Sequence, residues 1–263
     1  GECVTIRLPV RFFVGAPASD PPGLVTEDWT LAVARAVFIE LHCWNIGVPG
    51  GIPAPEEFWI YMGSQENHRR AAEIMATVIA PAMEAARRVN MPIVHVQPEV
   101  VARRYPNLRA RRPLEPVSSF VTAPRVENHA TRRADRVHGR GYHAWAGWEQ
   151  LDVAPPVAPR PRDVMVSDTQ EFHAWLAAHG KDVLFYTGFG ADLSLLDAAG
   201  GMRAMSRLGY RCVLLREGTM AVEYHDQEPH LHTQAAIRHV EAFIGYTASA
   251  ADFSRACAQA KAN

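Results

Sequence analysis

Short apolar runs alternate with amphipathic segments along most of this chain. Nearly continuous apolar runs predict buried strands at residues 34–40, 91–96, 163–167, 182–187 and 210–215. Apolar residues at helical spacing predict helices over residues 68–90, 168–179, 192–208, 233–244 and 250–262. Strands that are apolar on both faces and alternate with helices are typical of a parallel sheet covered on both sides. We therefore predict a doubly wound, mostly parallel α/β fold with helices on both faces.

Local signals refine this pattern. Pro81 lies inside the first predicted helix and should kink or divide it. Asp168 or Ser167 is placed to cap the helix that follows, and residues 188–190 form a glycine-rich turn. Residues 1–33 show little periodicity, so we interpret them as an irregular entry with edge-strand content around Val4–Val14. We expect one domain over residues 1–263.

Residues 98–162 interrupt the alternation with many prolines, twelve arginines and little periodicity. We interpret them as an insertion into the domain, with one or two short helices, that serves function or oligomerisation. Its arginines could receive an anionic substrate, or they could be solvated or part of an inter-subunit arm. Tyr142 and Trp145 stand in its most distinctive segment, HGRGYHAWAGW, and either line the binding pocket or pack the insertion onto the core.

The composition narrows the class of protein. Hydrophobic residues make up 48% of the 263 residues, charged residues 21%, and the net charge is -1. No general attraction to nucleic acid or membrane follows from that balance, and no apolar run reaches the roughly 18 residues of a membrane helix. Four cysteines without CxxC spacing are typical of a reducing compartment, and the first residues show no signal-peptide pattern. We expect a cytoplasmic protein with a small-molecule substrate and no nucleic-acid or membrane partner.

The predicted sheet indicates which polar residues lie near a ligand site. Ligands of such sheets bind beyond the carboxyl ends of the strands, so the residues just after Glu40, Val96, Thr187 and Leu215 belong to the functional edge. Lys181 precedes a strand and belongs to the opposite edge.

One segment resembles a known family. TGFGADLSLLDAAGGMRAMSRLGYRCVLLREGT, residues 187–219, is similar to the strand, glycine turn, nucleophile, helix and strand of the isochorismatase-like (cysteine hydrolase) family. The family's nucleophilic cysteine stands six residues after the first glycine, which from Gly188 gives Ser194. RAVFIELHCWN, residues 35–45, resembles the family's first strand, with Glu40 in place of its terminal aspartate. NMPIVHV (90–96) and LRE (215–217) resemble two further stretches.

The resemblance covers residues 34–97 and 163–253 and implies a small-molecule hydrolase that forms a homo-oligomer, a dimer or a tetramer. Three positions depart from the family pattern: serine replaces the cysteine, glutamate replaces the aspartate, and no lysine lies near residues 166–168, where the catalytic lysine is expected. Lys181 is at the wrong edge and Lys261 is in the C-terminal segment. Only positions therefore carry over: Ser194 for the nucleophile and Glu40 for the acid/base.

A serine nucleophile needs a general base within hydrogen-bond reach, because a helix N-terminus cannot ionise it as it can a cysteine. The candidates are Glu40, His42 and His95, and His42 joins Ser194 and Glu40 in the predicted catalytic set. Structural alternatives exist for three of these residues. Ser194 could be a small residue at a helix start, and Glu40 could be a carboxylate satisfied by backbone N–H groups or by an arginine. His95 could be a buried core histidine. The predicted substrate-binding residues are Trp44, Asn45, His95, Gly190, Ala191, Tyr142 and Trp145. Backbone N–H groups near residues 190–194 would hold an oxyanion.

No cofactor or metal is predicted. His225, Asp226, His230 and His232 are close in sequence, but their spacing matches no metal motif, and a solvated loop is the simpler interpretation. Cys43 is either a displaced nucleophile or a buried structural cysteine.

Three functional hypotheses remain open. The first is a hydrolase of an amide or related C–N bond, with covalent catalysis by Ser194 or acid catalysis by Glu40 alone. The second is a catalytically degenerate member that binds small molecules or acts as a scaffold. The third is a cysteine hydrolase in which serine was introduced to trap a substrate.

Overall fold

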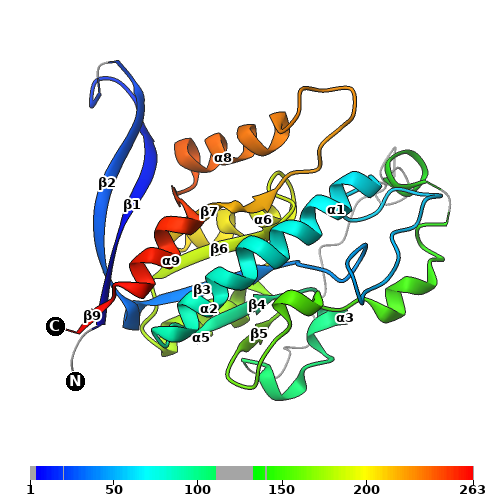
Figure 1. Cartoon of the computed structure of the whole chain (residues 1–263), viewed down its shortest axis with the longest axis horizontal. Helices are drawn as coiled ribbons and strands as arrows, with labels where there is room; N and C mark the ends of the chain where they lie inside the picture. The colour runs from blue at the N-terminus through cyan, green and yellow to red at the C-terminus, as the bar shows by residue number, and fades with distance from the viewer. Residues whose placement is uncertain (1–3, 20, 111–132, 140, 263) are drawn as a thin grey trace, which may run out of the picture.

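A mixed β-sheet forms the centre of the molecule (Figure 1). The computed structural model describes residues 4–19, 21–110, 133–139 and 141–262. The strand order is β2-β1-β8-β7-β6-β3-β4-β5, and the six strands from β8 to β5 are parallel. They are β3 (Ala36–Leu41), β4 (Ile93–Val96), β5 (Val164–Val166), β6 (Val183–Phe189), β7 (Arg211–Met220) and β8 (Tyr246–Ala248). The predicted mostly parallel sheet is confirmed.

Helices cover both faces of this sheet, as predicted. One face packs against α1 (Gln65–Ile74), α2 (Ala80–Arg88) and α9 (Ala250–Ala258). The other packs against α5 (Thr169–Ala178), α6 (Ser194–Asp197), α7 (Met202–Arg207) and α8 (Leu231–Phe243). Successive strand residues point to opposite faces, so Phe38 of β3 joins the first core and Ile39 the second. Glu40, two residues after Phe38, therefore faces the α1–α2 side.

The predicted helix over residues 68–90 begins earlier and changes its hydrogen bonding in the middle. A π-helical turn, Met75–Ile79, separates α1 from α2, and Pro81 lies in the first turn of α2. Proline lacks the N–H for the regular ladder and its ring crowds the preceding turn, which a wider turn relieves. Pro81 thus divides the helix without breaking it.

The interpretation of residues 1–33 as an irregular entry is wrong, although the strand content expected around Val4–Val14 is present as β1. β1 (Val4–Val14) and β2 (Gly23–Ala32) form a long antiparallel hairpin, which projects at the left of Figure 1. β1 also pairs with β8 and with the short β9 (Lys261–Ala262). β2 has Glu27 and Asp28 exposed and little buried surface, so its strand conformation depends on pairing with β1 rather than on a hydrophobic face.

The predicted helix over residues 192–208 is in fact two short helices, α6 and α7. Gly200 between them has φ +75, a conformation that favours glycine. Its N–H donates to Thr169 Oγ1 at 2.9 Å, and its carbonyl accepts from Tyr186 Oη at 2.7 Å. These tertiary bonds hold an interruption that the apolar spacing alone did not reveal.

The stretch from 98 to 162 contains α3 (Glu99–Ala102) and short helical turns at Pro106–Leu108, Arg133–His138, Ala146–Gln150 and Pro155–Val157. A further such turn, Val33–Arg35, precedes β3. Arg111, Arg112, Arg132 and Arg140 of the predicted insertion lie outside the described residues.

Candidate active site

Glu40 is the fully buried carboxylate at the carboxyl end of β3. Three donors surround it: the Cys43 N–H at 2.7 Å from Oε1, His95 Nδ1 at 2.6 Å from Oε2, and Gln97 Nε2 at 2.9 Å from both oxygens. Glu40 and His95 are register partners on β3 and β4, which brings the two side chains together on the same face. Such a set of donors satisfies the hydrogen-bonding capacity of a buried carboxyl group.

His95 bridges two carboxylates. Its Nε2 lies 3.1 Å from Asp163 Oδ2, which also accepts from Arg87 Nη2 at 2.6 Å and from the Arg160 N–H at 2.9 Å. Burial by itself lowers the pKa of the His95 imidazole, but the bonds to Asp163 and Glu40 outweigh it and raise that pKa. For the carboxyl of Asp163 the effect of burial is the opposite, because burial raises its pKa. The hydrogen bonds from His95 and from the Arg160 N–H outweigh burial and bring the pKa of Asp163 below its ordinary value. We call Glu40, His95, Gln97 and Asp163 the inner network.

The loop after β3 is attached to this network by aromatic side chains. Trp44 Nε1 donates to Gln97 Oε1 at 3.1 Å. Tyr61 Oη donates to the His42 carbonyl at 2.8 Å and accepts from the Trp44 N–H at 3.2 Å. The Trp44 ring stacks on His42 and packs against Tyr61, so the loop has a defined conformation.

His42 has an unusual environment for a polar residue. Its φ is 52°, its ring is half-buried, and its buried Nδ1 makes no hydrogen bond with any described residue. Burial lowers the pKa of the imidazole to about 4, even though the nearby Glu40 charge raises it. The ring is therefore neutral near pH 7 and has a nitrogen able to accept a proton, although as a weak base.

Cys43 is fully buried beside Glu40. Burial raises the pKa of its thiol well above the ordinary value, and the Glu40 charge raises it further. A thiol kept protonated in this way is a poor nucleophile, which favours the structural interpretation of Cys43.

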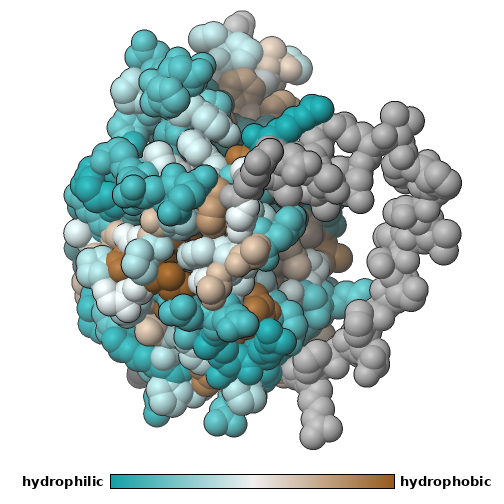
Figure 2. Space-filling view, turned by 90° about the vertical axis from the view of Figure 1, so that its right-hand side faces the viewer, coloured by the Kyte–Doolittle hydropathy of each residue, from teal (hydrophilic) through white to brown (hydrophobic). Residues whose placement is uncertain are grey.

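Ser194 begins α6, which follows β6, the strand next to β3. Its side chain is half-buried, and its hydroxyl makes no hydrogen bond to Glu40, His42, His95 or any other described residue. The preceding Leu193 is 52% exposed, so this turn reaches the surface. Figure 2 looks at the side of the molecule on the right of Figure 1, where loops follow the parallel strands. Hydrophilic residues cover most of it, with small hydrophobic areas between them.

Three backbone donors on either side of Ser194 are engaged. The Ala191 N–H donates to the Met220 carbonyl at 2.9 Å, and the N–H groups of Leu193 and Leu195 both donate to the Gly190 carbonyl at 3.1 Å. Among the described residues, the Ser194 N–H has no acceptor. Because α6 has only four residues, its dipole is small, and the Ser194 N–H is a donor without a described acceptor in the segment where we predict an oxyanion interaction.

The position expected for a catalytic lysine holds Ser167, at the carboxyl end of β5. The cation nearby is Arg109, which donates to Ser167 Oγ at 3.0 Å and forms ion pairs with Glu99 and Glu171. Both carboxylates lie within 3.1 Å of this guanidinium. The charge of Arg109 is therefore largely balanced by structural partners.

The other predicted binding residues have structural contacts. Asn45 uses its side chain to join the Gln150 carbonyl and the Asp152 N–H, at 3.1 and 2.9 Å. Tyr142 and Trp145 pack edge-to-face around Phe58. Trp145 also lines a cavity of about 520 Å³.

Among the described residues, no group of three or more His, Cys, Asp or Glu side chains is arranged to hold a metal ion. His230 lies within 2.6 Å of Arg70, while His225 is exposed. Within the same part of the chain, every helix is too short or too polar to cross a membrane.

Sequence reasoning missed three side chains of this region. Gln97 directly follows β4, and residues just after the carboxyl ends of parallel strands are the expected place for ligand contacts. Asp163 lies two residues before Met165, the register partner of His95, and only that pairing reveals its role. Asp192 precedes Ser194 by two residues, and burial raises the pKa of its carboxyl. It accepts from the Val222 N–H at 3.2 Å.

Comparison with known proteins supports the fold. No family model matches this sequence, and no curated protein matches it. The structure is similar to that of a cysteine hydrolase from Pseudomonas syringae pv. phaseolicola, with a TM-score of 0.55 and 13% identity over 88% of this chain and 96% of that one. It is also similar to an isochorismatase family protein from Desulfovibrio vulgaris, with a TM-score of 0.51 and 14% identity over 85% and 98%. At this identity the likeness shows a shared isochorismatase-like α/β fold.

Proposed function

We propose that this protein is a hydrolase that cleaves an amide or related C–N bond of a small molecule. One observation carries the proposal: β3 has a buried, hydrogen-bonded carboxylate near its carboxyl end, and the turn after the neighbouring β6 leads to a half-buried serine whose hydroxyl bonds to no described residue. Acyl transfer requires a nucleophile and an acid/base group in the same site. The similarity to solved cysteine hydrolases is consistent with this reaction.

In the proposed reaction, Ser194 Oγ bonds to the substrate carbonyl carbon and its proton passes to the neutral His42. That proton then moves to the leaving nitrogen as the C–N bond breaks. Water hydrolyses the resulting ester and restores the serine. Glu40 supplies the negative charge that favours the protonated imidazole, and His95 is a positioning residue because it is buried.

A binding protein without catalysis is the second candidate. It is favoured by the filled acceptors of Glu40 and by the lack of a hydrogen bond between Ser194 and any candidate base. An acid-catalysed variant, in which Glu40 acts without a covalent intermediate, requires Glu40 but not Ser194.

The decisive experiment assays the wild type, Ser194→Ala, Ser194→Cys and Glu40→Gln against small amides and ureides, with intact-protein mass measured after mixing. Covalent catalysis predicts an acyl adduct on Ser194→Cys and no turnover by Ser194→Ala or Glu40→Gln. Acid catalysis predicts that Ser194→Ala keeps much of its rate. Ser254→Cys, at a half-buried serine of α9, is the matched control for nonspecific acylation.

Full activity of Glu40→Gln would contradict both catalytic versions. If wild type and Ser194→Cys are both inert while a panel member raises the melting temperature, the binding-protein hypothesis replaces them.

A further inference from the structure

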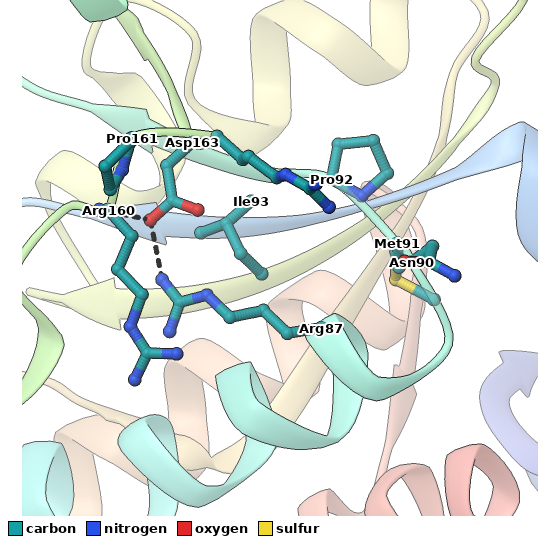
Figure 3. Close-up of a pocket in the computed structure, with 9 residues that line it drawn as sticks. Arg87, Asn90, Met91, Pro92, Ile93, Arg160, Pro161 and Asp163 are labelled. Atoms are coloured by element: carbon teal, nitrogen blue, oxygen red, sulfur yellow. Dashed lines mark hydrogen bonds and ion pairs between the residues drawn. The ribbon is translucent and has the colours of Figure 1, made fainter.

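A cavity of about 540 Å³ opens at the amino ends of β4 and β5, opposite the strand ends that hold Glu40 and Ser194 (Figure 3). It lies between the C-terminal turn of α2, the connection from α2 to β4, and the turn before β5. Its size is that of a pocket for a small organic molecule. Neither the sequence pattern nor the proposed reaction assigns it a role.

Three arginines make this cavity cationic. Arg87, Arg160 and Arg162 line it, and among the described residues that line it Asp163 is the one carboxylate. His95, Arg87 and the Arg160 N–H already bind Asp163 Oδ2, so the charge of Asp163 is compensated from inside the protein. Arg87 and Arg160 also pair with Glu84, so among the described residues the positive charge without a carboxylate partner is that of Arg162.

Two of these guanidinium groups have unused donors. Arg162 is exposed and forms no ion pair with any described residue. Arg87 has a side chain only 18% exposed; its Nε donates to no described residue but is buried, and its Nη1 and Nη2 pair with Glu84 and Asp163. A guanidinium presents a planar set of donors that suits a carboxylate.

Apolar residues also line the cavity. Pro161 is exposed and Pro92 is half-buried, whereas Met91 and Ile93 are almost fully buried and present little surface to a ligand. Figure 3 shows the Arg87 guanidinium directed at Asp163, with Ile93 nearby, whereas Arg160 bonds Asp163 through its backbone N–H and its side chain points away from that carboxylate. Apolar residues beside guanidinium groups suit a ligand with an anionic head and an apolar body.

We propose that this cavity binds a small organic carboxylate with an apolar body, whose carboxylate contacts Arg87, Arg160 and Arg162. The proposal does not depend on the proposed hydrolysis, although the cavity shares Asp163 with the inner network. Glu84 limits its affinity, because it pairs with Arg87 at 2.9 Å and with Arg160 at 2.5 Å and so competes for the same donors.

Calorimetric titration of the full chain with benzoate tests the proposal. Saturable one-to-one binding is expected, weaker at high salt, and absent for the neutral isostere benzamide. Arg162→Gln and Arg160→Gln should each weaken benzoate binding about fivefold. Arg207→Gln, at an exposed arginine of α7 without a described partner, should leave it unchanged.

Glu84→Gln gives a result that misfolding cannot imitate: benzoate binding should tighten, because both guanidinium groups lose a competing carboxylate. Unchanged or weaker binding in Glu84→Gln, or equal binding of benzamide and benzoate, would overturn the proposal. Inorganic phosphate is the comparison probe, and tighter binding of phosphate than of benzoate would refute the apolar-body assignment.

Discussion

The inner network and the two groups outside it, His42 and Ser194, differ in how completely their polar atoms are bonded. Glu40 and His95 are fully buried, and every nitrogen or oxygen of their side chains has a partner within 3.1 Å. His42 and Ser194 are half-buried and carry a ring nitrogen and a hydroxyl without described partners. The polar atoms of the inner network are therefore satisfied within the protein, whereas the His42 nitrogen and the Ser194 hydroxyl have no described partner.

The two histidines show this difference most clearly. Both lie near Glu40, yet the pKa of His95 is raised by its two carboxylates, whereas burial lowers that of His42 to about 4. One imidazole favours its proton and the other does not, because only His95 has an acceptor at each ring nitrogen.

The largest expected effect is on stability, from His95→Leu. Removing the imidazole leaves two buried carboxylates facing an apolar side chain, which should lower the free energy of unfolding by about 3–5 kcal/mol. Urea denaturation at pH 7 measures it. A loss below 1 kcal/mol would mean that the inner network is not coupled as described.

The pH profile adds a signature of the same residue. Because the folded pKa of His95 is raised, its contribution is fully present below its ordinary value of 6.5 and is lost as pH rises through the folded pKa. His95→Gln should remove this alkaline decline in the urea midpoint.

The next effect distinguishes His42 from His95, because the free energy of unfolding depends on pH in opposite directions for the two residues. A folded pKa of about 4, against an ordinary 6.5, means that stability falls as pH drops from 6.5 to 4, by at most about 3 kcal/mol. His42→Asn should flatten that acid limb, and asparagine tolerates the positive φ at this position. Unfolding curves between pH 4 and 7 test it, and an unchanged slope would contradict a buried neutral His42.

A smaller effect is expected where the outer loop meets the inner network. Trp44→Phe removes the indole donor to Gln97 Oε1 and should cost about 1 kcal/mol. Trp175→Phe in α5 is the matched control, because that indole N–H has no described partner. Equal losses in the two variants would show that the Trp44–Gln97 bond adds nothing beyond ring packing.

The smallest effect is expected at Ser194. Ser194→Ala removes a hydroxyl without a described partner, so the free energy of unfolding should change by less than about 0.5 kcal/mol. A combined thermal and urea measurement checks this. A loss above 1 kcal/mol would indicate a structural bond at Ser194 and weaken its assignment as a free nucleophile.

The sequence by itself determined the parallel sheet, the two helical layers and the places where Glu40 and Ser194 stand. Buried parallel strands have continuous apolar runs, and covering helices have an apolar stripe, so both leave a local signal. The same signal failed for β2, which buries little surface, and for residues 192–208, where the apolar spacing continues across the glycine break.

Only the tertiary structure decided what each polar side chain does. The pairing of β3, β4 and β5 brought Glu40, His95 and Asp163 into one buried network, although they are distant in sequence. Tertiary contacts also placed Arg109 next to Ser167, where the family pattern has a lysine. They placed three arginines around a cavity at the amino ends of β4 and β5. The physical reason is that hydrophobic periodicity specifies which face of an element is buried, whereas hydrogen bonds and charges depend on strand register and on contacts between distant segments.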